Sequence, residues 1–210
     1  MQSKTIIIFI GIVIVGIVIY TFNQVNSFDP EVHQEDIRKW QQDRQAVMMD
    51  PETSPIPDSV LSDFTFLKYY PIDPAYHVEA LFGTIKRNEN IFLRLSDGGT
   101  RRYKKYGYAS FELNGIPLKL LVLKPLEKNM GDQLFIPFYD ETSTFETYGG
   151  GRYLEPELVN DNTLLIDFNK AYNPYCAYGN SEYSCPIPPA ENRIGIKVEA
   201  GEKIPDFIKQ

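Results

Sequence analysis

The sequence is poor in the side chains that most often hold metal ions or act as catalytic bases. Its 210 residues include two histidines, His33 and His77, and two cysteines, Cys176 and Cys185. A structural zinc site needs four ligands, and neither histidine lies near the cysteines in the sequence. A metal held through sulfur and a cysteine nucleophile activated by histidine are therefore both disfavoured. We expect no cofactor.

Positive charge is also scarce, because 21 lysines and arginines stand against 28 acidic residues and give a formal net charge of −7. A nucleic-acid-binding protein needs a basic face that displaces counterions from phosphates, so we expect no nucleic-acid partner. One basic run, Arg101–Lys105, follows the turn residues Asp97–Thr100. We interpret this run as a solvated hairpin tip; contact with anionic headgroups or an acidic partner is the alternative.

Charge is absent altogether from residues 5–22, TIIIFIGIVIVGIVIYTF. As a helix this run spans about 27 Å, enough for the hydrocarbon core of a bilayer. Lys4 precedes the run and the next basic residue is Arg38. We therefore predict a single-pass membrane anchor over residues 1–26, with a cytoplasmic N-terminus and a periplasmic or extracellular C-terminal domain. A cleaved signal peptide, the rival, lacks its small-residue cleavage pattern here; either segment exports the domain.

Residues 27–57 predict an amphipathic helix and a connector. A helix over Ser27–Asp50 has Asp29 as a capping residue and Pro30 in its first turn. One face recurs at helical spacing and comprises Ile37, Trp40, Arg44, Val47 and Met48. Trp40, the only tryptophan, is expected to dock this helix on the domain. The proline-rich residues 51–57 are expected to be extended.

Beyond residue 57 the pattern changes to short strands. They are predicted at Tyr76–Ile85, Ile91–Leu95, Tyr106–Leu113, Ile116–Leu123, Leu134–Phe138, Leu164–Phe168 and Ile194–Val198. Asn114-Gly115 predicts a hairpin turn. No helix-length pattern separates the strands, so antiparallel pairing is favoured. For residues 58–210 we predict a mainly β fold, a small antiparallel β-sandwich or partly open barrel with the amphipathic helix packed on it.

Two long polar loops, Asp140–Leu154 and Asp167–Asn192, interrupt the strand pattern, and loops of this length are usually functional or held by their own side chains. They contain the strings FIPFYDET (from the preceding strand), ETYGGGRYL, DFNKAYNPYCAY and CPIPPAEN, and AGEK follows. These strings resemble the signature of DUF1684, a bacterial and archaeal family of unknown function. The similarity is dense over residues 135–203 and weaker back to Trp40. The family has no established activity, so the resemblance implies no reaction.

The same loops hold the candidate site residues. Asp140, Arg152 and Asp167 are the candidate catalytic residues, because a carboxylate can act as a base while an arginine holds an anionic or carbonyl group. The candidate ligand-binding residues are Thr142, Tyr148, Gly151, Asn169, Tyr172, Asn173 and Asn192. The run Gly149–Arg152 offers an anion cradle. Two alternatives stay open: Arg152 pairs with Asp140 or Asp167 and pins the loops, or Asp140, Glu141 and Asp167 bind calcium.

Cys176 and Cys185 are predicted to form a disulfide, because export favours oxidation and the cysteine count is even. Closing this loop contributes about 2.7 kcal/mol in the chain-entropy model.

Two functions fit these features. A binding or interaction module for an envelope component or small ligand agrees with the anchor, the lack of a histidine-based dyad and the tyrosine-rich loops. The alternative is a hydrolase- or lyase-like enzyme with Asp140 or Asp167 as base and Arg152 as electrostatic clamp. An open pocket lined by these side chains favours the enzyme, whereas burial and mutual hydrogen bonding favour a structural role.

Overall fold

The computed structural model describes residue 14 and residues 28–62, 64–127 and 131–205. The chain divides into two compact units, residues 1–35 and residues 36–210. Apart from Ile14, the predicted anchor over residues 1–26 lies outside the described residues. Within the described residues, no helix is long and apolar enough to cross a bilayer.

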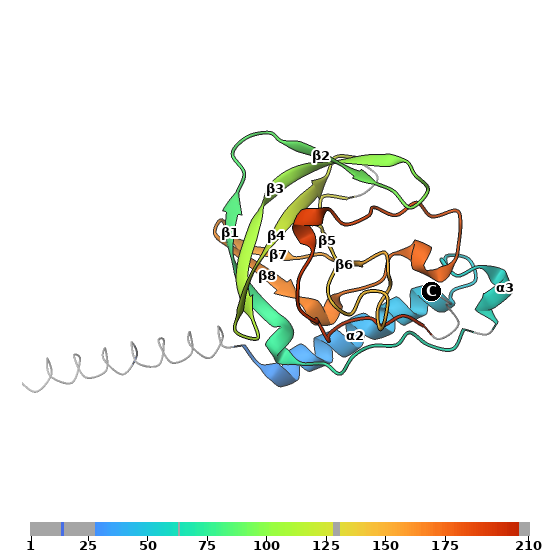
Figure 1. Ribbon diagram of the computed structural model, residues 1–210. Coiled ribbons are helices and arrows are strands. Elements are labelled where there is room, and N and C mark those ends of the chain that lie inside the picture. The colour runs from blue at the N-terminus through green and yellow to red at the C-terminus, as the bar shows by residue number, and fades with distance from the viewer. Residues whose placement is uncertain (1–13, 15–27, 63, 128–130, 206–210) are drawn as a thin grey trace, which may run out of the picture. The chain divides into compact units, whose positions relative to one another are not determined.

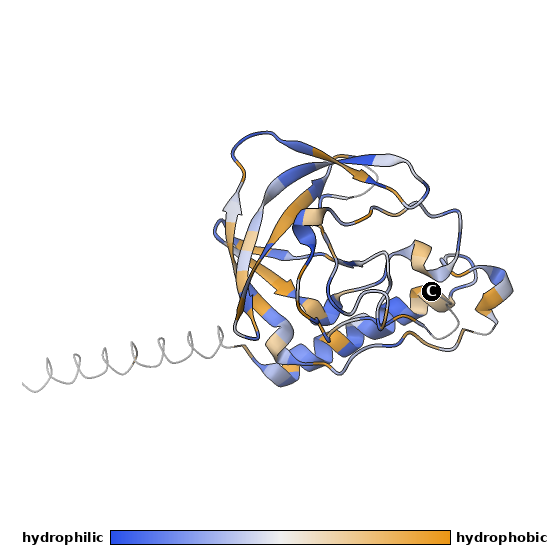
Figure 2. Cartoon of the chain, in the orientation of Figure 1, coloured by the Kyte–Doolittle hydropathy of each residue, from blue (hydrophilic) through white to orange (hydrophobic). Residues whose placement is uncertain are grey.

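The predicted amphipathic helix is confirmed as α2, Pro30–Met49. Its first turn is capped by the carboxylate of Asp29, which accepts a hydrogen bond of 2.9 Å from the backbone N–H of Glu31. The helix is mostly hydrophilic (Figure 2). Trp40 makes an edge contact with Tyr69, with ring centroids 6.2 Å apart, and Met48 is fully buried. The short helix α3, Asp58–Leu61, follows the proline-rich connector.

The strands in the described residues form two antiparallel sheets (Figure 1). They are β1 (His77–Thr84), β2 (Asn90–Arg94), β3 (Thr100–Leu113), β4 (Ile116–Pro125), β5 (Ile136–Phe138), β6 (Arg152–Leu154), β7 (Glu157–Asn160) and β8 (Thr163–Asp167). Short 3-10 helices span Pro74–Tyr76, Phe168–Lys170, Tyr175–Tyr178 and Ala190–Asn192. The fold is thus mainly β and antiparallel, as predicted, and the sheets do not close into a barrel.

The long strand β3 organises the larger sheet. One edge of β3 pairs first with β2 and then with β1, and its other edge pairs with β4 along almost its whole length. The order then continues from β1 to β8 and β7. The smaller sheet, β5 and β6, is tied to β4 because the backbones of Leu123 and Phe135 exchange two hydrogen bonds of 2.9 Å.

The main core lies between the two sheets. It combines inward side chains of β1, β3, β4 and β8 with Ile136 and Phe138 of β5 and Leu154 of β6. Along the second half of β3 and along β8, buried residues alternate with half-buried or exposed ones, the period expected of a strand with one covered face. The core therefore holds β5 and β8 in place, and the two polar loops begin where these strands end.

The structure confirms some strand predictions and corrects others. Asn114 and Gly115 have φ of +54° and +77° and form the predicted turn between β3 and β4. The basic run Arg101–Lys105 is not a hairpin tip; it lies inside β3 and pairs with β2. The strand predicted at Ile194–Val198 is wrong, because the N–H and C=O of Val198 bond the side chains of Asp140 and Arg152 instead of a neighbouring strand.

Candidate functional site

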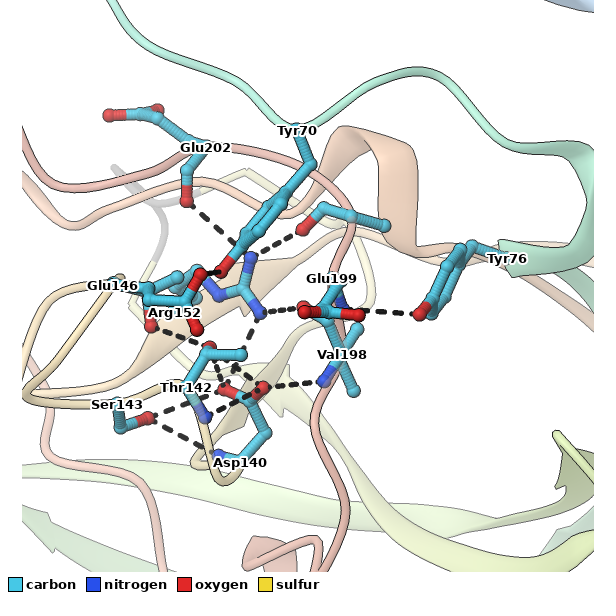
Figure 3. Close-up of polar contacts among 12 residues, drawn as sticks. Tyr70, Tyr76, Asp140, Thr142, Ser143, Glu146, Arg152, Val198, Glu199 and Glu202 are labelled. Carbon is cyan, nitrogen blue, oxygen red and sulfur yellow. Dashed lines mark hydrogen bonds and ion pairs between the residues drawn. The ribbon is translucent and has the colours of Figure 1, made fainter.

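Arg152 opens β6 and is enclosed by protein, with a side chain 0% exposed. Its guanidinium donates 2.9 Å to the carbonyl of Val198 and 3.4 Å to the carboxylate of Asp140. It also donates to the carbonyls of Ala200 and Glu202 (Figure 3). Burial lowers the pKa of Arg152, and the charge of Asp140 opposes that fall. Arg152 therefore fastens residues 198–203, here called the C-terminal segment, to the smaller sheet.

Asp140 lies two residues beyond β5 and is equally enclosed. Its carboxylate accepts hydrogen bonds from the hydroxyl of Thr142 at 2.8 Å, the hydroxyl of Ser143 at 3.3 Å and the backbone N–H of Val198 at 2.8 Å. Together with Arg152 these donors occupy both carboxylate oxygens. Asp140 thus organises its own loop and holds no free face toward solvent.

Glu202 completes this network and is fully buried. Its carboxylate accepts a hydrogen bond of 2.7 Å from Nε of Arg44 on α2, one of 2.9 Å from Nδ2 of Asn173, and one from the hydroxyl of Tyr178. Burial raises the pKa of Glu202, and the charge of Arg44 opposes the rise. Burial alone would lower the pKa of Arg44, but the charge of Glu202 and its hydrogen bond outweigh burial and raise it.

Asp167 and Asn169 belong to a different network. The carboxylate of Asp167, at the end of β8, accepts hydrogen bonds of 3.0 Å from the backbone N–H and the side chain of Asn169, and lies 3.2 Å from Nδ1 of His77. Asn169 also donates to the carbonyl of Asp73. Asn192 ties β4 to β5, since it bonds the backbone of Leu121 twice and the carbonyl of Pro137.

The expected convergence of the candidate residues is therefore only partial. Asp140, Arg152 and Asn173 are joined through Glu202, whereas Asp167 and Asn169 lie in the other network. In the predicted anion cradle Gly149–Arg152, the N–H of Gly151 donates to the carbonyl of Tyr148 and is not available to an anion. Gly151 is needed for packing: its φ is +87°, and a Cβ there would lie 2.6 Å from the carbonyl oxygen of Phe138.

The predicted disulfide is present between Cys176 and Cys185, whose Cα atoms are 6.2 Å apart. The loop that it closes is also held at its ends. The rings of Tyr175 and Tyr183 pack edge to face at 5.1 Å, and Cys185 exchanges hydrogen bonds with Ser96 in the turn after β2. The disulfide loop thus forms one fixed wall beside α2 and β3.

This wall borders a cleft of about 900 Å³. The other walls come from α2, β3, β6 and residues 133–135, which precede β5. Seven aromatic side chains line the cleft: Trp40, Tyr103, Phe135, Tyr153, Tyr172, Tyr175 and Tyr183. Ligand clefts in proteins usually measure about 300–1,000 Å³ and are lined by apolar and aromatic groups with a few polar ones, so this cleft has the size and composition of a ligand site.

The rings of the cleft pack on one another in sequence. Phe135 lies 5.7 Å from Tyr103 and 4.8 Å from Tyr153, and Tyr153 lies 5.8 Å from Tyr172. Burial raises the pKa of Tyr153, and burial and then the charge of Glu155 raise that of Tyr172, so both phenols are neutral at neutral pH. The hydroxyls of Tyr153 and Tyr172 donate to the carbonyl of Pro186 and to Glu155. The hydroxyl of Tyr103 is buried without a hydrogen-bond partner among the described residues.

Of the candidate residues, only Tyr172 and Cys185 line this cleft; the catalytic candidates Asp140, Arg152 and Asp167 do not. Two residues of the buried network, Arg44 and Glu202, were not among the candidates. The sequence did offer a signal for Arg44, which lies on the otherwise apolar helix face of Trp40 and Met48. An arginine that is buried there requires a buried acidic partner. The cleft itself had no local signal, since its walls come from distant segments.

Comparison with known proteins assigns the chain to a family. Residues 62–203 match the family model described as protein of unknown function (DUF1684), so the chain belongs to that family. The solution NMR structure of an uncharacterized protein of Haloarcula marismortui is similar, with 34% sequence identity and a TM-score of 0.63. The match covers 82% of this chain and 95% of that one. None of the curated proteins matches this chain.

Proposed function

We propose that this chain is a membrane-anchored, extracytoplasmic binding module, and that a small ligand from the envelope occupies the aromatic cleft. The observation that carries the proposal is the cleft of about 900 Å³, which seven aromatic side chains line. Tyrosine and tryptophan rings offer large, rigid contact areas with a polar edge, which suits recognition. The antiparallel sheets and the disulfide loop hold these rings in place before a ligand arrives, and that lowers the entropic cost of binding.

The hydrolase- or lyase-like alternative has less support. Asp140, one of its two proposed bases, and the clamp Arg152 have side chains that are 1% and 0% exposed. The side chain of the other proposed base, Asp167, is 9% exposed and belongs to a separate network with Asn169. The hydrogen-bonding groups of Asp140 and Arg152 bond protein atoms, apart from Nε of Arg152, which is buried without a partner in the described residues, and burial keeps a substrate from both side chains. A buried and mutually bonded pair of this kind is structural.

The proposed ligand site is tested with Trp40, the sole tryptophan, which lines the cleft and makes intrinsic fluorescence a report on ligand entry. A metabolite screen on the full-length chain in non-ionic detergent is expected to find compounds that change this fluorescence. Val47→Tyr narrows the cleft and is expected to weaken their binding at least about tenfold, the effect of losing one well-packed contact.

Met49→Tyr is the matched control, because Val47 and Met49 are both exposed on α2, at 41% and 53%, and Met49 does not line the cleft. If no compound perturbs Trp40, or if Val47→Tyr binds as the native chain does, the cleft is not the ligand site.

The proposed localisation rests on the uncharged residues 5–22, since a helix of such residues prefers lipid to water. The full-length chain is expected to sediment with membranes. Alkylation before lysis is expected to find no free thiol, because the disulfide persists outside the reducing cytosol. Cys176→Ser, which leaves one alkylatable thiol, is the positive control. A chain that stays in the soluble fraction with both thiols alkylated contradicts this localisation.

A further inference from the structure

The two cationic side chains that line the cleft are already compensated by acidic groups that do not line it. Nε of Arg44 lies 2.7 Å from the carboxylate of Glu202, and Nε of Arg101 lies 3.9 Å from that of Glu127. The guanidinium of Arg44 also donates to the carbonyl of Asn173. Each arginine thus has an acidic partner outside the lining, and the exposed contact of Arg101 is the weaker of the two.

Three carboxylates also line the cleft, those of Asp43, Glu155 and Glu182, and all three residues are exposed. Within the described part of the chain, none of them forms an ion pair with a lysine, arginine or histidine. Glu155 accepts only the neutral hydroxyl of Tyr172, at 2.8 Å. The lining of the cleft thus carries an excess of negative charge, in a chain whose formal net charge is already −7.

The aromatic walls also favour a positively charged ligand. The face of an aromatic ring is electron-rich and attracts cations, tryptophan most strongly. One ring of the cleft already does so, because the guanidinium carbon of Arg44 lies 4.5 Å from the ring centroid of Tyr172. Tyr103 adds a buried hydroxyl with no hydrogen-bond partner among the described residues. The oxygen of a neutral phenol can accept a hydrogen bond from an ammonium group.

We infer that the cleft binds an organic ammonium ion, a cation that carries its charge on carbon-substituted nitrogen. The rings cover the carbon substituents while the three carboxylates attract the charge. A bare metal ion fits less well: in the residues described, no group that includes these carboxylates brings its ligand atoms within 4.8 Å of one another. The inference rests on the proposed function and names the ligand class of that site.

The test compares a charged ligand with a neutral analogue of the same shape. Choline and spermidine are titrated into the full-length chain in non-ionic detergent, with Trp40 fluorescence and calorimetry as readouts. Dimethylbutanol, in which carbon replaces the nitrogen of choline, is the neutral control. Choline is expected to bind on the order of tenfold more tightly than dimethylbutanol. Its affinity is expected to fall at high salt, because exposed charges are screened.

The matched variants replace carboxylates by amides, which removes the negative charge and keeps the shape of the side chain. The triple variant Asp43→Asn, Glu155→Gln and Glu182→Gln is expected to weaken choline binding about tenfold, since each exposed carboxylate contributes modestly. Glu112→Gln, an exposed change on β3 outside the cleft, is expected to leave binding unchanged. All four substitutions lie on the surface, so melting temperatures should match the native chain.

Each outcome of these titrations either supports or overturns the ammonium inference. Equal affinity for choline and dimethylbutanol, or unchanged choline binding by the triple variant, overturns the ammonium inference and leaves the cleft as a site for neutral ligands. No response to choline or spermidine also overturns the inference, and the metabolite screen then decides the proposed function separately. Preference for choline that is lost in the triple variant supports both.

Discussion

Replacing Arg152 with alanine is expected to lower the free energy of unfolding by about 3–5 kcal/mol, because breaking a buried ion pair leaves the other charge without compensation. The charge left behind is that of Asp140, and the carbonyls of Val198 and Ala200 lose their donor as well. For a chain of this size, about 2–4 °C per kcal/mol gives a fall in melting temperature of roughly 10 °C. Calorimetry or circular dichroism measures it.

Arg193→Ala is the control for this change. Arg193 is exposed and its guanidinium carbon lies 4.8 Å from the ring centroid of Tyr139, so its loss is expected to cost at most about 1 kcal/mol. If the Arg152 variant melts like the native chain but no longer binds ligand, Arg152 acts in recognition and the structural role assigned to it is wrong.

The second large effect is expected for Glu202→Ala. This change leaves the guanidinium of Arg44 without its carboxylate, and the hydroxyl of Tyr178 and the amide of Asn173 without their acceptor. The expected loss is again about 3–5 kcal/mol, measured by denaturant unfolding at constant m-value.

A double variant separates the buried charge from the packing. Arg44→Met with Glu202→Leu replaces both charges by apolar groups of similar size, which is often close to neutral for stability. We therefore expect the double variant to be more stable than Glu202→Ala alone. A double variant that is less stable than the single one would show that the ion pair itself stabilises the fold.

Features set by neighbouring residues were predictable from the sequence. The turn at Asn114-Gly115 needs two residues that tolerate positive φ, and these two supply them. The helix α2 begins where Asp29 can cap it. The disulfide joins two cysteines that are nine positions apart in the sequence. In each case the physical cause lies within about ten residues of chain.

Features that depend on distant partners were not predictable in the same way. Ile194–Val198 has the alternation of a strand, but its backbone is engaged by Asp140 and Arg152. The charges of Arg101–Lys105 suggested a tip, yet Tyr103 between them is fully buried and makes this run part of β3. The pairing of Arg152 with Asp140 was one of two open alternatives, and burial decides between them because a buried arginine is stable only with partners.

The C-terminal segment sets the order of events in biogenesis. Residues 198–203 supply carbonyl acceptors for Arg152 and the carboxylate for Arg44, so neither guanidinium can be buried with its full set of partners until these residues have left the ribosome. A nascent chain that lacks these residues is therefore expected to pack α2 and β6 only late in synthesis. That delay agrees with the export proposed above, because a polypeptide crosses a bilayer before it becomes rigid.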